Sequence, residues 1–153
     1  MKPRRNPSKA ELLERGPSCF RRKLDRQQLR DLAICHTVNL DAVARGDADP
    51  EILWDIVGAA LTWHRVAAVM HIGEFEMDEQ MAVATHLLER WKATGRVEWD
   101  RDDYALARLG VVVMDELALI APLSVAMAAS HWSEIELDRI DRASRRDRLG
   151  VTA

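Results

Sequence analysis

Apolar residues recur at steps of three and four through most of the sequence, while the alternation typical of β-strands is nearly absent. Side chains with this spacing share one face of a helix. The stretch "DADPEI" indicates a helix start, because Asp49 can act as N-cap and Pro50 suits the first helical position. Glycines follow several of the apolar segments, where they can end a helix. The pattern therefore predicts an all-α protein.

Four principal helices are expected, over about residues 25–45, 50–72, 77–94 and 101–121, with Asp100 as the cap of the fourth. Short connections favour antiparallel neighbours, so we expect an up-down bundle with a short C-terminal helical appendage. The appendage would hold a short helix near residues 125–129 and a last helix that begins near Glu134, since Ser133 and Glu136 have capping-box spacing. The fourth helix has an apolar stripe of Leu106, Leu109, Val113, Leu117 and Ile120. The chain thus divides into a basic, partly flexible arm (1–24), a bundle (25–122), C-terminal helices (123–148) and a disordered tail (149–153).

The length of 153 residues and an apolar content of 48% suit one buried core. No run of about 18 apolar residues is uninterrupted by charge or proline, so we expect no contact with a membrane. The basic N-terminus lacks the apolar segment of a secretory signal. Cys19 and Cys35 belong to no paired motif. A cytoplasmic protein is the simplest interpretation.

Charge is segregated along the chain. Residues 1–30 carry a net charge of +7, residues 31–136 carry −12, and residues 137–153 carry +2. An acidic body repels phosphates and favours basic protein surfaces, whereas the basic ends have the opposite preference. This charge distribution is compatible with either a protein partner or a nucleic acid.

The sequence offers no constellation for catalysis. Its serines lie outside any Gly-x-Ser-x-Gly setting, and its scattered glycines form no phosphate-binding loop. We therefore expect a protein that is not an enzyme and has no cofactor.

Three histidines are followed by glutamate at the third position: His71, His86 and His131. Di-iron bundles use the reverse order, Glu-x-x-His, which this chain lacks. His64 and His71 lie two turns apart, about 10 Å along a helix axis, which is too far to share one metal ion. We expect both to be packing residues of the second helix and predict no metal site, with a His/Glu metal-binding bundle as an alternative.

"SVAMAASHWSEIELDRIDRASRR" loosely resembles the helix-turn-helix of Fis-type regulators. His131 stands at the usual turn glycine, and acidic residues at the front of the second helix oppose phosphate binding. A DNA-binding regulator is the first alternative function. Its nucleic-acid contacts would be Arg4, Arg5, Arg21, Arg22, Lys23, Arg139, Arg142, Arg145 and Arg146.

Five tryptophans are many for this length, and Trp54 and Trp63 lie off the main stripe of their helix. A broad buried helix explains them, and an exposed aromatic contact surface is the alternative. Under that alternative Trp54, Trp63 and Trp99 would bind a partner.

At "AVARGDADPEILW", "KATGRVEWDRDDYALA" and "VVMDELA" the chain resembles a loose group of short proteins encoded in prophages and other mobile elements of proteobacteria. The resemblance covers about residues 28–120 and implies an all-helical accessory protein with no assigned reaction. With the acidic body, it favours a non-enzymatic interaction protein, acting as inhibitor, adaptor or regulator on a host macromolecule. A host protein is the expected partner, and a second copy of the chain is a further candidate.

Overall fold

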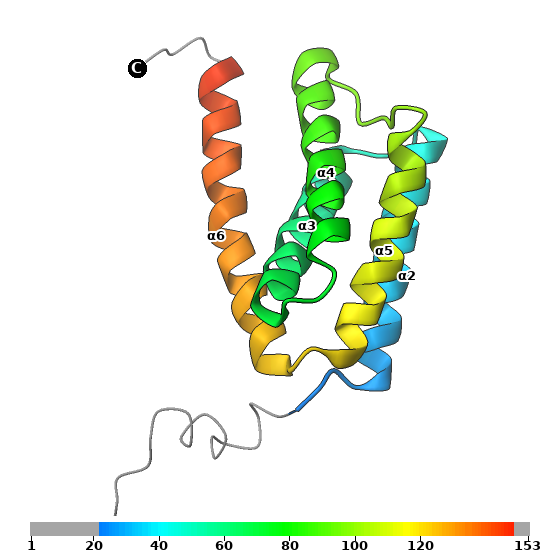
Figure 1. The fold of residues 1–153 in the computed structure, drawn as a ribbon. Helices are drawn as coiled ribbons and strands as arrows, with labels where there is room; N and C mark the ends of the chain where they lie inside the picture. The colour runs from blue at the N-terminus through cyan, green and yellow to red at the C-terminus, as the bar shows by residue number, and fades with distance from the viewer. Residues whose placement is uncertain (1–21, 149–153) are drawn as a thin grey trace, which may run out of the picture.

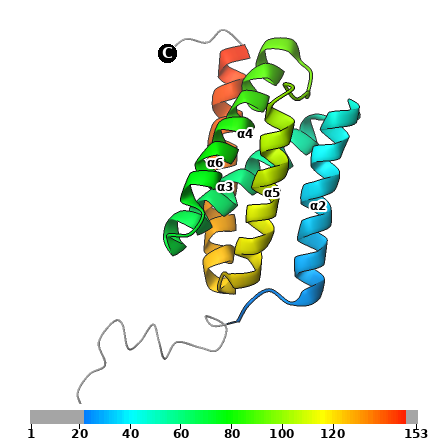
Figure 2. The same ribbon diagram turned by 45° about the vertical axis from the view of Figure 1, so that its right-hand side comes forward.

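The computed structural model describes residues 22–148, which hold five α-helices and no strand (Figure 1). The helices are α2 (Arg26–Arg45), α3 (Pro50–Met70), α4 (Glu74–Thr94), α5 (Asp103–Ile120) and α6 (Leu123–Arg148). Consecutive helices are joined by short connections, and α3 crosses the others obliquely (Figure 2). The predicted all-α class is confirmed.

The central helix is α3, which contacts each of the other four. α2 packs beside α5, α4 packs against both α3 and α5, and α6 lies on the side of α3 away from α5 (Figure 1). These contacts are compatible with an up-down bundle of α2 to α5. Within the described residues α3 also has the length and apolar character of a membrane span, but its apolar face is buried by its neighbours, as in the core helix of a bundle.

The predicted short appendage is wrong. α6 is the longest described helix, with 26 residues, and it continues without a break through the serines where a helix boundary was expected. Its Leu137 approaches Gly58 of α3 so closely that a Cβ on that glycine would lie 2.9 Å from the leucine Cδ1. Helix α6 therefore packs against α3 and contributes Ala129 to the core, so it does not stand apart as an appendage.

Helix ends follow the local sequence in the first half of the chain. The carboxylate of Asp49 accepts a hydrogen bond from the Ile52 amide at 3.0 Å, and Gly46 ends α2 with a φ of 77°. The end of α3 differs from expectation, since His71 adopts the left-handed C-cap conformation and Gly73 precedes α4. Asp100 does not cap α5; its carboxylate accepts from the adjacent Arg101 amide.

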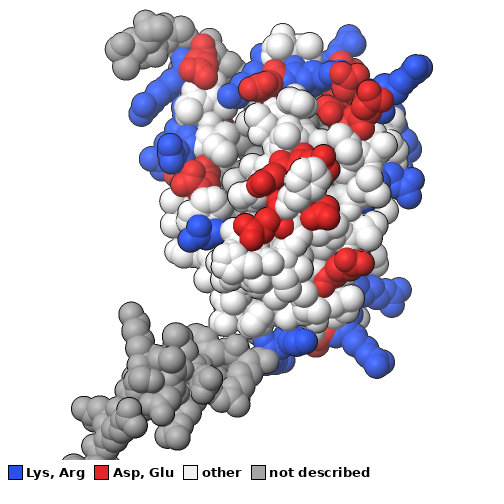
Figure 3. Space-filling model, viewed as in Figure 1, with Lys and Arg blue, Asp and Glu red and all other residues white. Residues whose placement is uncertain are grey.

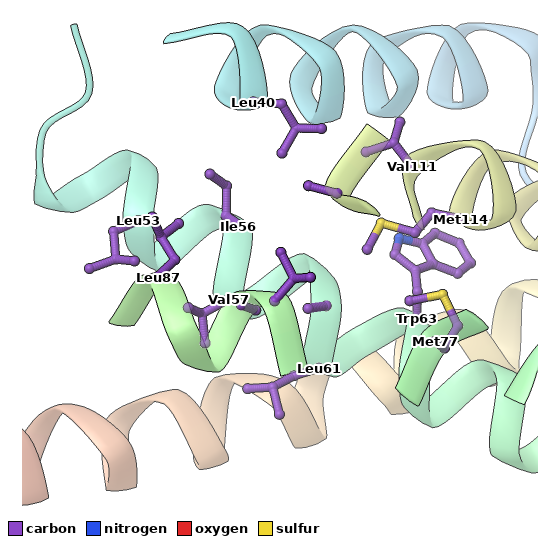
Figure 4. Close-up of a cluster of buried hydrophobic side chains, with 14 of the residues drawn as sticks. Leu40, Leu53, Ile56, Val57, Leu61, Trp63, Met77, Leu87, Val111 and Met114 are labelled. Atoms are coloured by element: carbon purple, nitrogen blue, oxygen red, sulfur yellow. The ribbon is translucent and has the colours of Figure 1, made fainter. Parts of the chain in front are cut away.

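The core gathers large apolar side chains from α3, α4 and α5, with Leu40 from α2 (Figure 4). Leu53, Met77, Leu87 and Met114 are all at most 1% exposed. These residues come from α3, α4 and α5, so each helix buries its apolar face against side chains of the others. The bundle is held by burial between helices rather than by helix propensity.

The stripe predicted for α5 is wrong except at Leu117, which is buried. Leu106, Leu109 and Ile120 are exposed, and Val113 is only partly buried. The buried face instead consists of Ala107, Gly110, Val111, Met114, Leu117 and Ala118. Three of these buried residues are small, and at Gly110 helix α5 comes close to Gln80 of α4.

Candidate functional site

The tryptophans named as partner-binding residues belong to the interior. Trp63 is 3% exposed and lies edge-on to the His36 ring at 6.5 Å. Trp54 packs edge-on against Trp91 with ring centroids 5.9 Å apart, and the Trp99 indole donates to the Leu40 carbonyl at 3.1 Å. The prediction of an aromatic contact surface at Trp54, Trp63 and Trp99 is therefore wrong for Trp63, and the other two are half-buried core residues.

The helix-turn-helix interpretation fails on the continuity of α6. Ser133, expected to cap a second helix, lies inside α6 and is 3% exposed. Its hydroxyl donates to the Ser130 carbonyl at 2.7 Å and accepts from Thr62 of α3 at 2.8 Å. The serine therefore joins α6 to α3, and the described residues 123–148 contain no turn that could set one helix against another for DNA reading.

The cations at the end of α6 are mostly paired within the same helix. Arg139 contacts Glu136 at 3.4 Å, Arg142 contacts Asp138 at 2.6 Å and Arg145 contacts Asp141 at 2.8 Å. Acids one turn away offset each positive charge, so these arginines make a weak phosphate-binding stripe. Arg146, Arg22 and Lys23 are exposed. The remaining predicted contacts, Arg4, Arg5 and Arg21, lie outside the described residues.

The histidines pair with carboxylates but do not cluster. His64 of α3 lies 2.8 Å from Asp78 of α4 and is part-buried, whereas His71 is exposed and contacts Glu74 at 3.1 Å. His71 is thus not the packing residue that its spacing predicted, because α3 ends at Met70. His86 contacts Asp103 at 3.6 Å. Among residues 22–148 no three potential ligands come together as a metal site would require.

A buried histidine meets a partly exposed aspartate where α2 packs against α5. His36 Nδ1 lies 3.5 Å from Asp115 Oδ1, and burial lowers the pKa of His36 more than the carboxylate raises it. A cavity of about 20 Å³ adjoins this histidine and Gln80 of α4. That volume admits one water molecule, whereas ligand pockets span about 300–1,000 Å³. This cluster therefore orders the interior and offers no room to a substrate.

The most unusual exposed feature lies at the start of α4. Phe75 is 70% exposed and stands between Glu74 and Glu76. The next residue, Glu76, lines a groove of about 510 Å³ between the α3–α4 turn and the end of α5. The groove is lined by Ile72, Gly73, Glu76, Val113, Glu116, Leu117, Leu119 and Ile120. We call Phe75 together with this groove the Phe75 surface.

The Phe75 surface combines apolar side chains with acidic neighbours. Acidic side chains gather over α4 near the centre of the face in Figure 3. Ile72 and Ile120 are also exposed, so three large apolar side chains stand near one negatively charged area. Sequence periodicity missed this surface because Ile120 was assigned to the core. The signal that was available is "GEFEMDE", where an aromatic residue is flanked by acids at a helix start.

Comparisons with protein-family models, with curated proteins and with solved structures find no match to this chain.

Proposed function

We propose that this protein is a non-enzymatic interaction protein, encoded by a phage or other mobile element, which binds a host protein through the Phe75 surface. In this proposal α2 to α5 act as an up-down bundle that presents the surface. The observation that carries it is Phe75, an aromatic ring left 70% exposed and adjacent in sequence to Glu76, which lines an apolar groove. Exposed aromatic residues next to a pocket are the usual anchors of protein interfaces.

The charge around Phe75 specifies the kind of partner. Glu76 and Glu116 line the groove, and Glu74 and Asp78 lie on the first turns of α4. A partner with basic residues around an apolar anchor would complement this surface, and a phosphate backbone would be repelled. We therefore propose a basic surface or basic amphipathic segment of a host protein as the ligand.

Site-specific photo-crosslinking tests this proposal. A photoreactive phenylalanine analogue replaces Phe75 in one variant and Ile135 of α6, an apolar residue of comparable exposure, in the control. In lysate of a proteobacterial host, the analogue at position 75 should give a discrete protein adduct. The adduct should weaken at high salt and in a Glu76→Lys variant, because screening and charge reversal remove the electrostatic attraction.

Two results would contradict the proposal: the same adducts from both positions, or no adduct at position 75. Once the partner is purified, Phe75→Ala should weaken its binding by about 2 kcal/mol, roughly thirtyfold, as expected of a central aromatic anchor. The variant should fold normally, because the ring is largely in solvent. Thermal unfolding of the variant checks this directly.

A further inference from the structure

A second apolar area lies on the opposite side of α5 from α4, where α5 packs beside α2. Leu109 and Val112 of α5 are 65% and 55% exposed, and Ile34 and Val38 of α2 are about half exposed. The two helices are side by side in both views (Figures 1 and 2). We call these four side chains the α2–α5 face. It is separate from the Phe75 surface, and no described residue covers it.

The α2–α5 face is anchored to a rigid part of the bundle. The Tyr104 hydroxyl of α5 donates to Asp41 of α2 at 2.9 Å, and His36 meets Asp115 further along the same helix pair. Between the helices is a hollow of about 570 Å³ whose lining includes Leu109, Val112 and Arg108. The face is therefore a preformed surface with a recess, which suits a helix as occupant.

The exposed side of α5 has the spacing of a helix-helix seam. Ala105, Leu109, Val112 and Glu116 follow one another at steps of four, three and four. Alternation of these steps places side chains in a line along one face, as in coiled coils. A helix that is apolar on both its inner and outer faces is normally covered on both. Helix α5 is covered only on its inner face by the described residues.

Charge on this seam identifies the occupant. Arg108 and Glu116 stand four residues before and four residues after Val112. If two copies of α5 lie antiparallel with the two-fold axis at Val112, Arg108 of each copy comes opposite Glu116 of the other. In the described residues Arg108 makes no ion pair; it lies 6.0 Å from the Tyr104 ring. The seam is therefore self-complementary in charge.

We propose that the α2–α5 face binds a second copy of this chain, forming a symmetric dimer through antiparallel α5 helices. An interface of this kind uses the same patch on both copies, which is the commonest symmetry of oligomers. Val112 meets its own counterpart at the axis, and Leu109 packs into the hollow of the other copy. Two Arg108 to Glu116 pairs at the rim fix the antiparallel orientation. This dimer draws Glu116 of the groove into the interface and leaves Phe75 itself exposed in each copy.

Sedimentation of the full chain across a dilution series tests the proposal. The protein should sediment at twice its mass of 17.4 kDa and dissociate on dilution. Leu109→Glu should give a folded monomer. The glutamate would bury a charge in the dimer interface, whereas position 109 is exposed to solvent in the separate chain. Ile135→Glu on α6 is the matched control and should remain dimeric.

A charge swap tests the orientation. Arg108→Glu should weaken the dimer about tenfold or more, because it faces Glu116 of the other copy with like charge. The double change Arg108→Glu with Glu116→Arg should restore the affinity in the antiparallel dimer.

Three results would overturn the proposal. A monomer at every concentration would mean that something else covers the α2–α5 face, such as the basic N-terminal residues or a different protein. A dimer unaffected by Leu109→Glu would place the interface elsewhere. Failure of the charge swap to restore a dimer weakened by Arg108→Glu would refute the antiparallel pairing. None of these outcomes depends on Phe75, so they are distinct from a failure of the proposed host-protein binding.

Discussion

Gly110 of α5 faces Gln80 of α4 at the closest approach of these two helices. A Cβ on Gly110 would collide with the Gln80 side-chain oxygen and would lie 2.6 Å from its Cδ and 3.0 Å from its Cγ. Gln80 is 2% exposed, and its Oε1 has no hydrogen-bond partner within the described residues. Because three side-chain atoms are involved in a packed interface, rotation of the amide alone cannot make room for the methyl group.

We predict that Gly110→Ala destabilises the protein although alanine is the better helix former. Replacing glycine by alanine in a helix interior is worth about 1 kcal/mol in favour of folding. Overpacking a filled interface costs about 1–3 kcal/mol. Since the clash extends to Cγ, we take the upper part of that range, which leaves a net loss of about 1–2 kcal/mol in the free energy of unfolding.

A double-mutant cycle isolates the cause. In a Gln80→Ala background the obstructing atoms are gone, so Gly110→Ala should stabilise the protein by about 1 kcal/mol. The coupling energy between the two positions should therefore be about 2–3 kcal/mol, at the high end for residues in contact. Urea unfolding followed by circular dichroism measures all four variants. If the dependence of the unfolding free energy on urea concentration is unchanged, only stability has altered.

The reasoning would be refuted if Gly110→Ala changed stability equally in both backgrounds. That result would mean that the helices separate without cost, and that the small-residue face of α5 does not explain its close approach to α4. Gly95→Ala is unsuitable as a control, because that glycine has a φ of 74° and would be strained for a different reason.

Three further predictions concern other parts of the fold. Burial lowers the pKa of His36 below its usual 6.5, so the folded state resists protonation and stability should fall as the pH drops below about 6.5; urea midpoints should show this decline, reduced in His36→Leu. Trp63→Ala should cost about 3–5 kcal/mol by calorimetry or urea unfolding, and a loss under about 1 kcal/mol would contradict its place in the core. Asp49→Ala should cost about 1 kcal/mol through loss of the α3 cap, whereas Asp47→Ala, which removes an exposed ion pair with Arg45, should cost less than about 0.5 kcal/mol in the same assay.

The helices themselves could be predicted because their signals are local. Asp49 with Pro50, and the glycines at 46 and 95, act through backbone geometry within one turn, so their meaning does not depend on the rest of the fold.

Periodicity failed where a helix is apolar on more than one side. In α5 the apolar spacing favoured the Leu109 side, but the structure buries the Met114 side, where Gly110 closely approaches Gln80 of α4. The continuity of α6 could not be predicted from the sequence either. Ser133 has the spacing of a cap, but α3 places the Thr62 hydroxyl beside it, so the serine is satisfied within a helix.

The features of the candidate surfaces also divide into those set by the sequence and those set by tertiary structure. The sequence by itself determined the acidic character of the body and the absence of a recognisable catalytic motif, since charge and residue spacing are properties of the chain. Tertiary structure alone decided that Trp63 is interior while Phe75 and Leu109 face solvent. An apolar residue has the same transfer free energy wherever it stands in the chain, and only the packing of neighbouring helices determines whether that free energy is gained within the chain or left for a partner.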